Sequence, residues 1–310
     1  MIILDYSFVI PCYRSENTIE IVVEEIKKEM NLRKDFSYEI ILVNDCSPDN
    51  VWNVISNLAK NSCGTIKAIN LAKNFGQHAA LLAGYSICSG EYVVSLDDDG
   101  QTPLDYLGDL IKEINKGYDV VYAFYEEIKQ SAFRRFGTWM AQKMGEIMLE
   151  QPRDLKGSSF YIARRFIIEE MIKYKNSYPY LGGLVLRTTR NISCVQTKHR
   201  ARLEGTSGYS FKSLFSLWLN GFTAFSVKPL EFSTFLGFIF AIIGFVYAIV
   251  TIIRRLVGIT QVEGWSTIIA LLLIIGGMIL IMLGLIGEYI GRIYISINNS
   301  PQYVIKEIIK

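Results

Sequence analysis

Three consecutive carboxylates follow an apolar run in Leu96-Asp97-Asp98-Asp99-Gly100-Gln101. Adjacent like charges repel one another, so three acids at the end of a strand do not serve stability. Hard oxygen ligands at positions 97, 99 and 101 can face one Mg²⁺ or Mn²⁺ and leave coordination positions for phosphate oxygens. The alternative is an acidic N-cap for a helix that begins near Leu104, but a cap needs one acid rather than three. The run therefore predicts a metal site at Asp97, Asp99 and Gln101.

Two further polar runs follow apolar segments. Asp45 stands in Val43-Asn44-Asp45-Cys46-Ser47-Pro48-Asp49, where its carboxylate can hold a ribose or a base edge. Asp49 in the same run is interpreted as the N-cap of the next helix. Lys73, in Asn70-Leu71-Ala72-Lys73-Asn74-Phe75-Gly76-Gln77, either lies near phosphates or is a solvated loop lysine.

The elements that must position these residues alternate between strand and helix periodicity. Nearly continuous apolar strands separated by amphipathic helices indicate a mostly parallel sheet covered on both faces. In such sheets ligands bind beyond the carboxyl ends of the strands, where the polar runs lie. The predicted strands are 6–11, 39–44, 65–71, 91–96 and 118–124, and the predicted helices are 18–30, 51–60, 77–88 and 104–115.

Composition divides the chain into two parts. Of the 310 residues 50% are hydrophobic, and residues 232–290 carry almost no charge. A net charge of +2 gives no reason to expect nucleic acid as a partner. The five cysteines are scattered without a CxxC pair, which indicates reduced thiols rather than a disulfide or zinc framework.

Two uncharged stretches, 232–253 and 265–287, each reach the length of about 20 residues that crosses a bilayer core. They predict an antiparallel transmembrane hairpin, and two adjacent runs of this length disfavour buried core helices. The N-terminus has neither the basic region nor the cleavage site of a signal peptide, so we expect the globular part in the cytosol. Residues 209–228 have an aromatic-rich apolar face, which predicts a helix in the membrane interface. Packing of this helix on the domain core is the alternative.

Four runs carry a family resemblance: IPCYRSENTI (10–19), LVNDCSPD (42–49), NLAKNFGQHAALLAG (70–84) and SLDDDGQTP (95–103). In this order they resemble the family 2 inverting glycosyltransferases with the GT-A fold. The more specific resemblance is to the polyprenyl-phosphate sugar transferase branch: dolichyl-phosphate mannose synthases, bactoprenol glucosyltransferases and undecaprenyl-phosphate aminoarabinose transferases. Asn-Phe-Gly, Asp-x-Asp-x-Gln and two C-terminal spans carry that branch assignment.

The resemblance implies a multi-pass enzyme of the inner (plasma) membrane with a cytosolic catalytic domain. It would move a sugar from a nucleotide-sugar, with UDP favoured over GDP, to a polyprenyl phosphate such as undecaprenyl phosphate, for cell-envelope glycans. Whether it forms a homo-oligomer is left open. The implied parts are a GT-A domain (1–208), the interfacial helix (209–228), the hairpin (229–293) and a cytosolic tail (294–310).

The resemblance also implies residue roles. Pro11, Tyr13, Glu16 and Asp45 match nucleotide-contacting positions, as do Asp97 and Asp98. Asp97, Asp99 and Gln101 match the metal and diphosphate site. The acceptor-phosphate positions are Arg134, Thr138, His199 and Arg202, although a solvated helix face is an equal alternative for Arg134. Asp97, Asp99 and Arg202 would be catalytic.

Two positions depart from the relatives. Ser159 stands where many carry an acid often called the catalytic base, and Gly208 stands where many carry a lysine. A phosphate monoester has a second pKa near 6, so it is largely anionic at neutral pH and needs no base. The missing acid therefore favours a phosphate acceptor.

Two rival functions make different demands on the sequence. A transferase that extends a lipid-linked saccharide or a protein through a hydroxyl would need a base, for which Asp98 or Asp154 would have to serve. A catalytically idle membrane scaffold or a lipid-carrier translocase helper would not need the acidic run.

Overall fold

The computed structural model describes residues 4–33, 35–125, 146, 152, 155, 157–176, 179–198, 228–257, 264–298 and 301–310. Its described strands form one sheet in the order β7-β5-β6-β4-β1-β2-β3-β8. Pairing is parallel between β1 and β2, β2 and β3, β1 and β4, and β5 and β7. The strands are β1 (Leu4–Cys12), β2 (Tyr38–Asn44), β3 (Ile66–Leu71), β4 (Gly90–Ser95), β5 (Val120–Tyr125), β6 (Tyr161–Arg164), β7 (Ile192–Thr197) and β8 (Ile305–Ile309).

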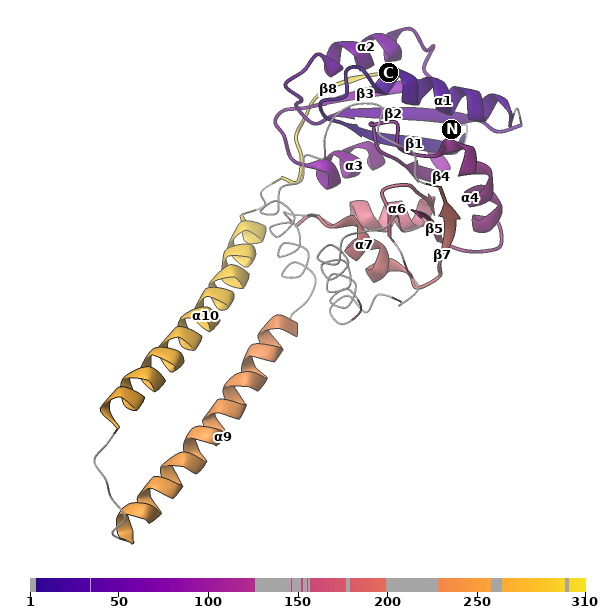
Figure 1. Cartoon of the computed structure of the whole chain (residues 1–310). Helices are drawn as coiled ribbons and strands as arrows, with labels where there is room; N and C mark the ends of the chain where they lie inside the picture. Colours follow the sequence, from indigo (N-terminus) through magenta and orange to yellow (C-terminus); the bar gives the residue numbers. More distant parts are fainter. Residues whose placement is uncertain are drawn as a thin grey trace.

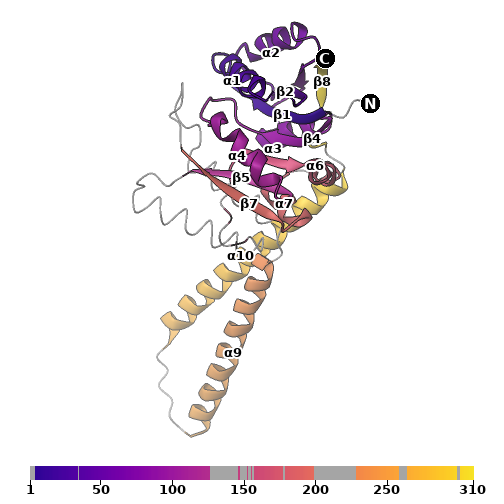
Figure 2. The same ribbon diagram turned by 90° about the vertical axis from the view of Figure 1, so that its right-hand side faces the viewer.

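Helices cover both faces of this sheet, as Figures 1 and 2 show. Alternate residues of β1 point to opposite faces, so Phe8 and Ile10 enter one apolar cluster and Val9 enters the other. The first cluster is closed by α1 (Ile19–Asn31), α2 (Val51–Lys60) and α4 (Leu107–Ile114). The second is closed by α3 (Gln77–Tyr85), α6 (Arg165–Ile172) and α7 (Leu181–Thr188).

The five predicted strands and four predicted helices are present, with ends displaced by at most three residues. The helix predicted over 104–115 begins as a short 3₁₀ turn, η1 (Leu104–Tyr106), before α4. The structure adds β6, β7 and β8, which sequence periodicity did not predict. Because β6 is antiparallel to both β4 and β5, the sheet is mixed although most of its strand pairs are parallel.

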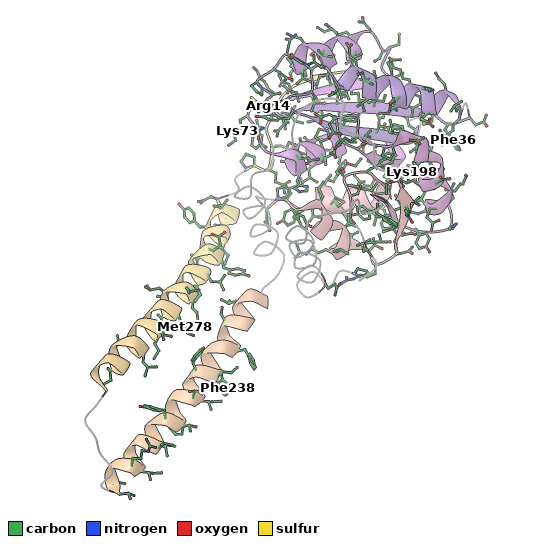
Figure 3. The ribbon with its side chains drawn as sticks, in the orientation of Figure 1. Arg14, Phe36, Lys73, Lys198, Phe238 and Met278 are labelled. Atoms are coloured by element: carbon green, nitrogen blue, oxygen red, sulfur yellow. The ribbon has the colours of Figure 1, made fainter. Side chains whose placement is uncertain are left out.

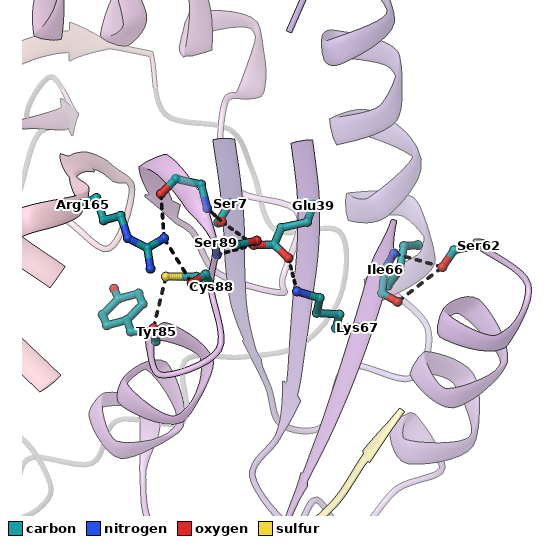
Figure 4. Close-up of polar contacts among 10 residues, drawn as sticks. Ser7, Glu39, Ser62, Ile66, Lys67, Tyr85, Cys88, Ser89 and Arg165 are labelled. Carbon is teal, nitrogen blue, oxygen red and sulfur yellow. Dashed lines mark hydrogen bonds and ion pairs between the residues drawn. The ribbon is translucent and has the colours of Figure 1, made fainter. Parts of the chain in front are cut away.

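The amino ends of the strands are held by a buried carboxylate (Figure 4). The side chain of Glu39, at the start of β2, is 1% exposed. Its Oε1 accepts hydrogen bonds from the hydroxyls of Ser7 and Ser89, both at 2.7 Å, and its Oε2 pairs with Lys67. Desolvation by burial raises the pKa of Glu39, but the bonds from Lys67, Ser7 and Ser89 together outweigh it and leave the pKa lowered. This network is a structural tie at the end of the sheet opposite the candidate site.

Two long helices extend from the domain: α9 (Lys228–Leu256) and α10 (Trp265–Ile297) (Figure 1). Their apolar side chains, among them the labelled Phe238, point outward along much of their length (Figure 3). Within α10, Ile274–Ile295 is long and apolar enough to cross a membrane, and the apolar stretch Ser233–Tyr247 of α9 is shorter. The helix α9 extends three to four residues beyond each end of the predicted span 232–253. The helix α10 begins at the predicted residue 265 but continues ten residues beyond 287, and the chain then returns to the domain as β8.

Candidate functional site

Four parallel strands bring the predicted polar runs to one edge of the sheet. Cys12, the last residue of β1, pairs with Asn44, and Asn44 pairs with Asn70 in β3. The loops after these strands and after β4 therefore emerge side by side. Arg14 and Lys73, which lie in two of these loops, appear on the same flank of the domain in Figure 3. The sequence prediction that the polar runs converge is met.

Asp98 joins the β4 loop to the β1 loop. Its Oδ2 accepts a hydrogen bond of 2.9 Å from the backbone N–H of Tyr13, and its backbone oxygen accepts one of 2.6 Å from the hydroxyl of Thr18. Desolvation raises the pKa of Asp98 to about 6, and the neighbouring Asp97 charge also raises it, against the hydrogen bond from the N–H of Tyr13. Asp98 thus faces the nucleotide-contacting turn predicted around Tyr13.

Asp97 faces a different set of partners. Its Oδ1 accepts a hydrogen bond of 2.7 Å from Nε2 of Gln77, the first residue of α3. Its Oδ2 accepts one from the hydroxyl of Ser159. Asp99 turns to its own loop, where its Oδ1 accepts a bond of 3.0 Å from the backbone N–H of Gln101.

The acidic run suits a metal that also binds substrate. Among the residues described, no three acidic, histidine or cysteine side chains gather into a ready metal cluster. Mg²⁺ commonly uses one or two carboxylates together with substrate phosphates rather than an all-protein cage. The hard oxygens of Asp97, Asp99 and Gln101 fit that pattern. The acidic N-cap alternative is wrong, because neither η1 nor α4 has a side-chain hydrogen bond at its N-cap.

Asp45 fixes the loop between β3 and α3. It is buried, and its two oxygens accept backbone N–H bonds from Phe75 at 2.7 Å and Gly76 at 2.8 Å. Burial raises the pKa of Asp45 against these two bonds. Gly76 has a φ of 89°, a conformation that glycine adopts without strain. Asp45 therefore shapes the Asn-Phe-Gly loop, and its contact with a nucleotide stays a prediction.

The turns after β1 and β2 are cross-linked. Glu16 accepts a hydrogen bond of 2.8 Å from the N–H of Asn50, and its own N–H donates to Asp49 at 3.0 Å. The N–H of Arg14 donates to the hydroxyl of Ser47 at 2.8 Å. Asp49 was predicted as an N-cap. The residue at the N-cap position of α2 is Asn50, but Oδ1 of Asp49 accepts a hydrogen bond of 3.4 Å from the N–H of Val51, the first residue of α2. Asp49 therefore caps this helix end in addition to bridging the two turns.

The remaining predicted residues divide into two groups. Pro11 is buried within β1, opposite Val43, and the ammonium of the exposed Lys73 lies 4.9 Å from the ring centroid of Phe75. The acceptor-side predictions and the interfacial helix lie outside the described residues and stay predictions; the residues concerned are Arg134, Thr138, Asp154, His199 and Arg202.

Sequence reasoning missed Gln77 as a partner of Asp97. The only available signal was its place, directly after the Asn-Phe-Gly loop. The next residue, His78, packs edge-to-face with Tyr180 at 5.7 Å between ring centroids. Desolvation lowers the pKa of His78 to about 4, so its imidazole is neutral at physiological pH.

A mostly parallel α/β sheet with acidic loops gathered beyond four carboxyl ends belongs to the architecture in which ligands bind at that edge of the sheet. Residues 7–175 match Glycosyl transferase family 2, and residues 228–293 match the GtrB C-terminal hairpin. The chain belongs to glycosyl transferase family 2 and is a glycosyltransferase, as the sequence resemblance predicted.

Individual relatives align along nearly the whole chain. The putative glycosyltransferase CsbB of Bacillus subtilis (strain 168) is 34% identical over 97% of this chain and 91% of its own length. The undecaprenyl-phosphate 4-deoxy-4-formamido-L-arabinose transferase of Photorhabdus laumondii is 30% identical over 98% and 94%, respectively. The bactoprenol glucosyl transferase of Shigella phage SfII is 29% identical over 97% of each chain.

Among solved structures, glucosyl-3-phosphoglycerate synthase of Mycobacterium tuberculosis, in complex with Mn²⁺ and UDP-glucose, shares the fold. Its TM-score is 0.51 at 20% identity, and the match covers 70% of this chain and 76% of that chain. At this identity the likeness establishes the fold alone, a GT-A-like sheet.

Proposed function

We propose that this glycosyltransferase moves a sugar from a nucleotide-sugar to a polyprenyl phosphate. The proposed donor is a UDP-sugar, and the proposed acceptor is undecaprenyl phosphate. The observation that carries the proposal is the alignment of relatives named for undecaprenyl phosphate and bactoprenol over at least 97% of this chain. That alignment includes the C-terminal hairpin as well as the catalytic domain. Ser159 at the place of the acid supports it, because a phosphate acceptor needs no base.

In the proposed reaction an oxygen of the lipid phosphate attacks the anomeric carbon of the sugar. The bond from that carbon to the nucleoside diphosphate breaks, and the configuration inverts. Mg²⁺ or Mn²⁺, held by Asp97, Asp99 and Gln101, would supply counter-charge for the leaving diphosphate. The fold similarity to a synthase crystallised with Mn²⁺ and UDP-glucose is compatible with this assignment.

Residues of this chain hold the donor-site loops and the acceptor phosphate in position. Asp45 holds the loop of Phe75 and Gly76, and Asp98 holds the turn of Tyr13, so that the walls of the donor site are formed before the donor binds. Arg202 and Arg134 are proposed to hold the acceptor phosphate, assisted by Thr138 and His199. Charge-assisted bonds of this kind orient phosphate oxygens for attack.

We place the enzyme in the inner (plasma) membrane as a two-span protein with its catalytic domain in the cytosol. The interfacial helix proposed for 209–228 would hold the site at the membrane surface, where the phosphate of the lipid lies. The product, a polyprenyl-phosphate sugar, would supply cell-envelope glycan assembly or modification.

The direct test measures release of the nucleoside diphosphate by the full-length protein in detergent. A panel of UDP- and GDP-sugars is offered with undecaprenyl phosphate, with undecaprenol, or with no lipid, and the lipid product is identified by mass spectrometry. We expect release only with the lipid phosphate and one donor. Asp99→Asn and EDTA should each reduce the rate about 100-fold or more, the scale of losing a main electrostatic stabiliser.

Three outcomes would contradict the proposal. Turnover with undecaprenol but not with its phosphate would favour a hydroxyl acceptor. Full activity in EDTA would refute the metal assignment. No turnover with any donor, by a protein that retains its native melting temperature, would favour the scaffold alternative.

A further inference from the structure

The pairing of β4 with β6 brings residues 97 and 159 opposite one another. The antiparallel register pairs Val93 with Ala163 and Ser95 with Tyr161. Continued by two residues beyond each strand, the same register sets Asp97 against Ser159. Residues two apart along a strand share a face, so both side chains lie on the face to which Ser95 and Tyr161 belong.

The helix α3 covers that same face. Val93, Tyr161 and Tyr85 belong to one apolar cluster, in which the hydroxyls of Tyr85 and Tyr161 are hydrogen-bonded. The first residue of α3, Gln77, therefore reaches Asp97 from above the sheet, while Ser159 reaches it from the neighbouring segment. Each donor takes one carboxylate oxygen: Gln77 binds Oδ1 at 2.7 Å and Ser159 binds Oδ2.

We propose that Gln77 and Ser159 are positioning residues that together hold the carboxylate of Asp97 in its donor-binding orientation. The inference rests on the proposed function, because it takes the ligand of Asp97 to be a nucleoside diphosphate with its metal. Two neutral hydrogen-bond donors stabilise the charged form of a carboxylate and restrict its rotation. The site then binds the donor without first having to order Asp97.

This pairing also explains the departure at position 159. An acid there would place a second negative charge against Asp97, beside the adjacent charge of Asp98, and like charges at this range disfavour ionisation. A serine at the same place supplies a donor. In this chain the hydroxyl of Ser159 thus serves the ground-state orientation of Asp97 rather than proton transfer from an acceptor.

A purely structural role for Ser159, as a tie between the ends of β4 and β6, makes a different prediction. A tie would affect folding regardless of the side chain at position 97. A positioning residue acts through the carboxylate of Asp97, so its effect on nucleotide binding must become smaller when that carboxylate is replaced by the weaker acceptor of an amide. A double-mutant cycle between the two positions separates these cases.

The experiment titrates the full-length protein in detergent with UDP or GDP in the presence of Mn²⁺ and reads the dissociation constant by calorimetry. Hydrogen bonds to charged groups are strong enough that we expect Ser159→Ala and Gln77→Ala each to weaken binding about 10-fold. Ser159→Thr keeps the hydroxyl and should restore most of the affinity. In an Asp97→Asn background, Ser159→Ala should change the dissociation constant less than about two-fold.

Ser158→Ala is the matched control. The Ser158 hydroxyl accepts a bond of 3.0 Å from the N–H of Phe160, so this variant loses a hydrogen bond at the adjacent position that does not involve Asp97. Its dissociation constant should equal that of the wild type, and melting temperatures measured alongside report any loss of folding.

The proposal is overturned if Ser159→Ala binds the nucleotide as the wild type does, or if its effect is equally large in the Asp97→Asn background. In either case the catalytic function proposed above would stand. If the wild type bound neither UDP nor GDP with Mn²⁺, the proposed function would itself be refuted, and the assignment of Gln77 and Ser159 would fall with it.

Discussion

Asp97, Asp98 and Asp99 are chemically identical neighbours, yet each makes a different set of contacts. Asp97 is held by Gln77 and Ser159, Asp98 accepts from the N–H of Tyr13, and Asp99 accepts from the N–H of Gln101. The separate partners relieve the mutual repulsion that a run of acids would otherwise impose. A single sequence motif thereby connects the loops after β1 and β4, the first residue of α3, and the segment before β6.

Two of the described non-glycine residues with a positive φ lie at this site. Arg14, directly after the β1 turn residue Tyr13, has a φ of 58°, and Cys46, next to Asp45, has a φ of 50°. Left-handed conformations disfavour side chains other than glycine and asparagine, and residues held there cluster at functional sites. The guanidinium of Arg14 lies 5.5 Å from the ring centroid of Tyr13, so its charge lies at an edge rich in carboxylates.

Arg14→Asn is expected to change stability and donor binding in opposite directions. Asparagine tolerates the left-handed region, so the variant should be more stable by about 0.5–1 kcal/mol. Removal of the cation should also weaken binding of the anionic donor several-fold. Thermal melting gives the first quantity, and calorimetry with UDP or GDP and Mn²⁺ gives the second.

Cys63 offers a control for this prediction. It is exposed and has a φ of 50°, but it lies in the turn before β3, at the end of the sheet away from the site. Cys63→Asn should gain similar stability and leave nucleotide affinity unchanged. A lower melting temperature for Arg14→Asn would refute the strain argument, and unchanged affinity would refute the binding role.

At the scale of elements, β8 joins the C-terminus to the strand that ends at the Asn-Phe-Gly loop. It pairs antiparallel with β3, and the N–H of Ala72, just beyond β3, donates to the backbone oxygen of Val304 at 2.9 Å. A register shift between Asn70 and Leu71 interrupts the alternation of β8. As a result Ile309 packs on one apolar cluster and Ile305 on the other.

The segment β8 is therefore packed into the catalytic domain, and its contribution to the free energy of unfolding can be measured. Ile305→Ala and Ile309→Ala should each lower stability by about 1–2 kcal/mol, less than the roughly 2–5 kcal/mol typical of a fully buried site, because both side chains are half-buried. Ile308, which is 38% exposed, is the control, and Ile308→Ala should cost much less. Equal losses in melting temperature at all three positions would show that β8 does not pack as described.

At the scale of the whole molecule, α9 and α10 leave the domain and the chain returns to it through β8 (Figure 2). Both ends of the helical pair therefore lie at the catalytic domain. The large exposed apolar side chains along the two helices would be unfavourable in water, and contact with lipid removes that cost. This arrangement is what the proposed two-span orientation requires.

The orientation is tested by labelling cysteines with a membrane-impermeant maleimide in spheroplasts of a bacterial expression host. Gly264→Cys, just before α10, should react in intact spheroplasts. The exposed native Cys46 and Cys63 in the catalytic domain should react only after the membrane is permeabilised. The reverse pattern would place the catalytic domain outside the cell. Labelling of position 264 and of the catalytic-domain cysteines in intact spheroplasts would exclude a two-span protein.

The sequence by itself determined which segments become strands and helices in the first 125 residues, because burial on both sheet faces leaves long apolar runs with clear periodicity. It also determined the apolar hairpin, because few charges can be tolerated in such helices. The position of the acids beyond the strand ends could likewise be predicted from the sequence. The family followed from the same motifs.

Only the tertiary structure decided how the site is assembled. Gln77 and Ser159 are 20 and 62 residues from Asp97 along the chain, and their contact depends on α3 packing and on the β4–β6 register. The pairing of β8 with β3 likewise joins segments more than 200 residues apart. Local periodicity reports whether a residue is buried, but a hydrogen-bond partner is set by which distant segments the packed core brings together.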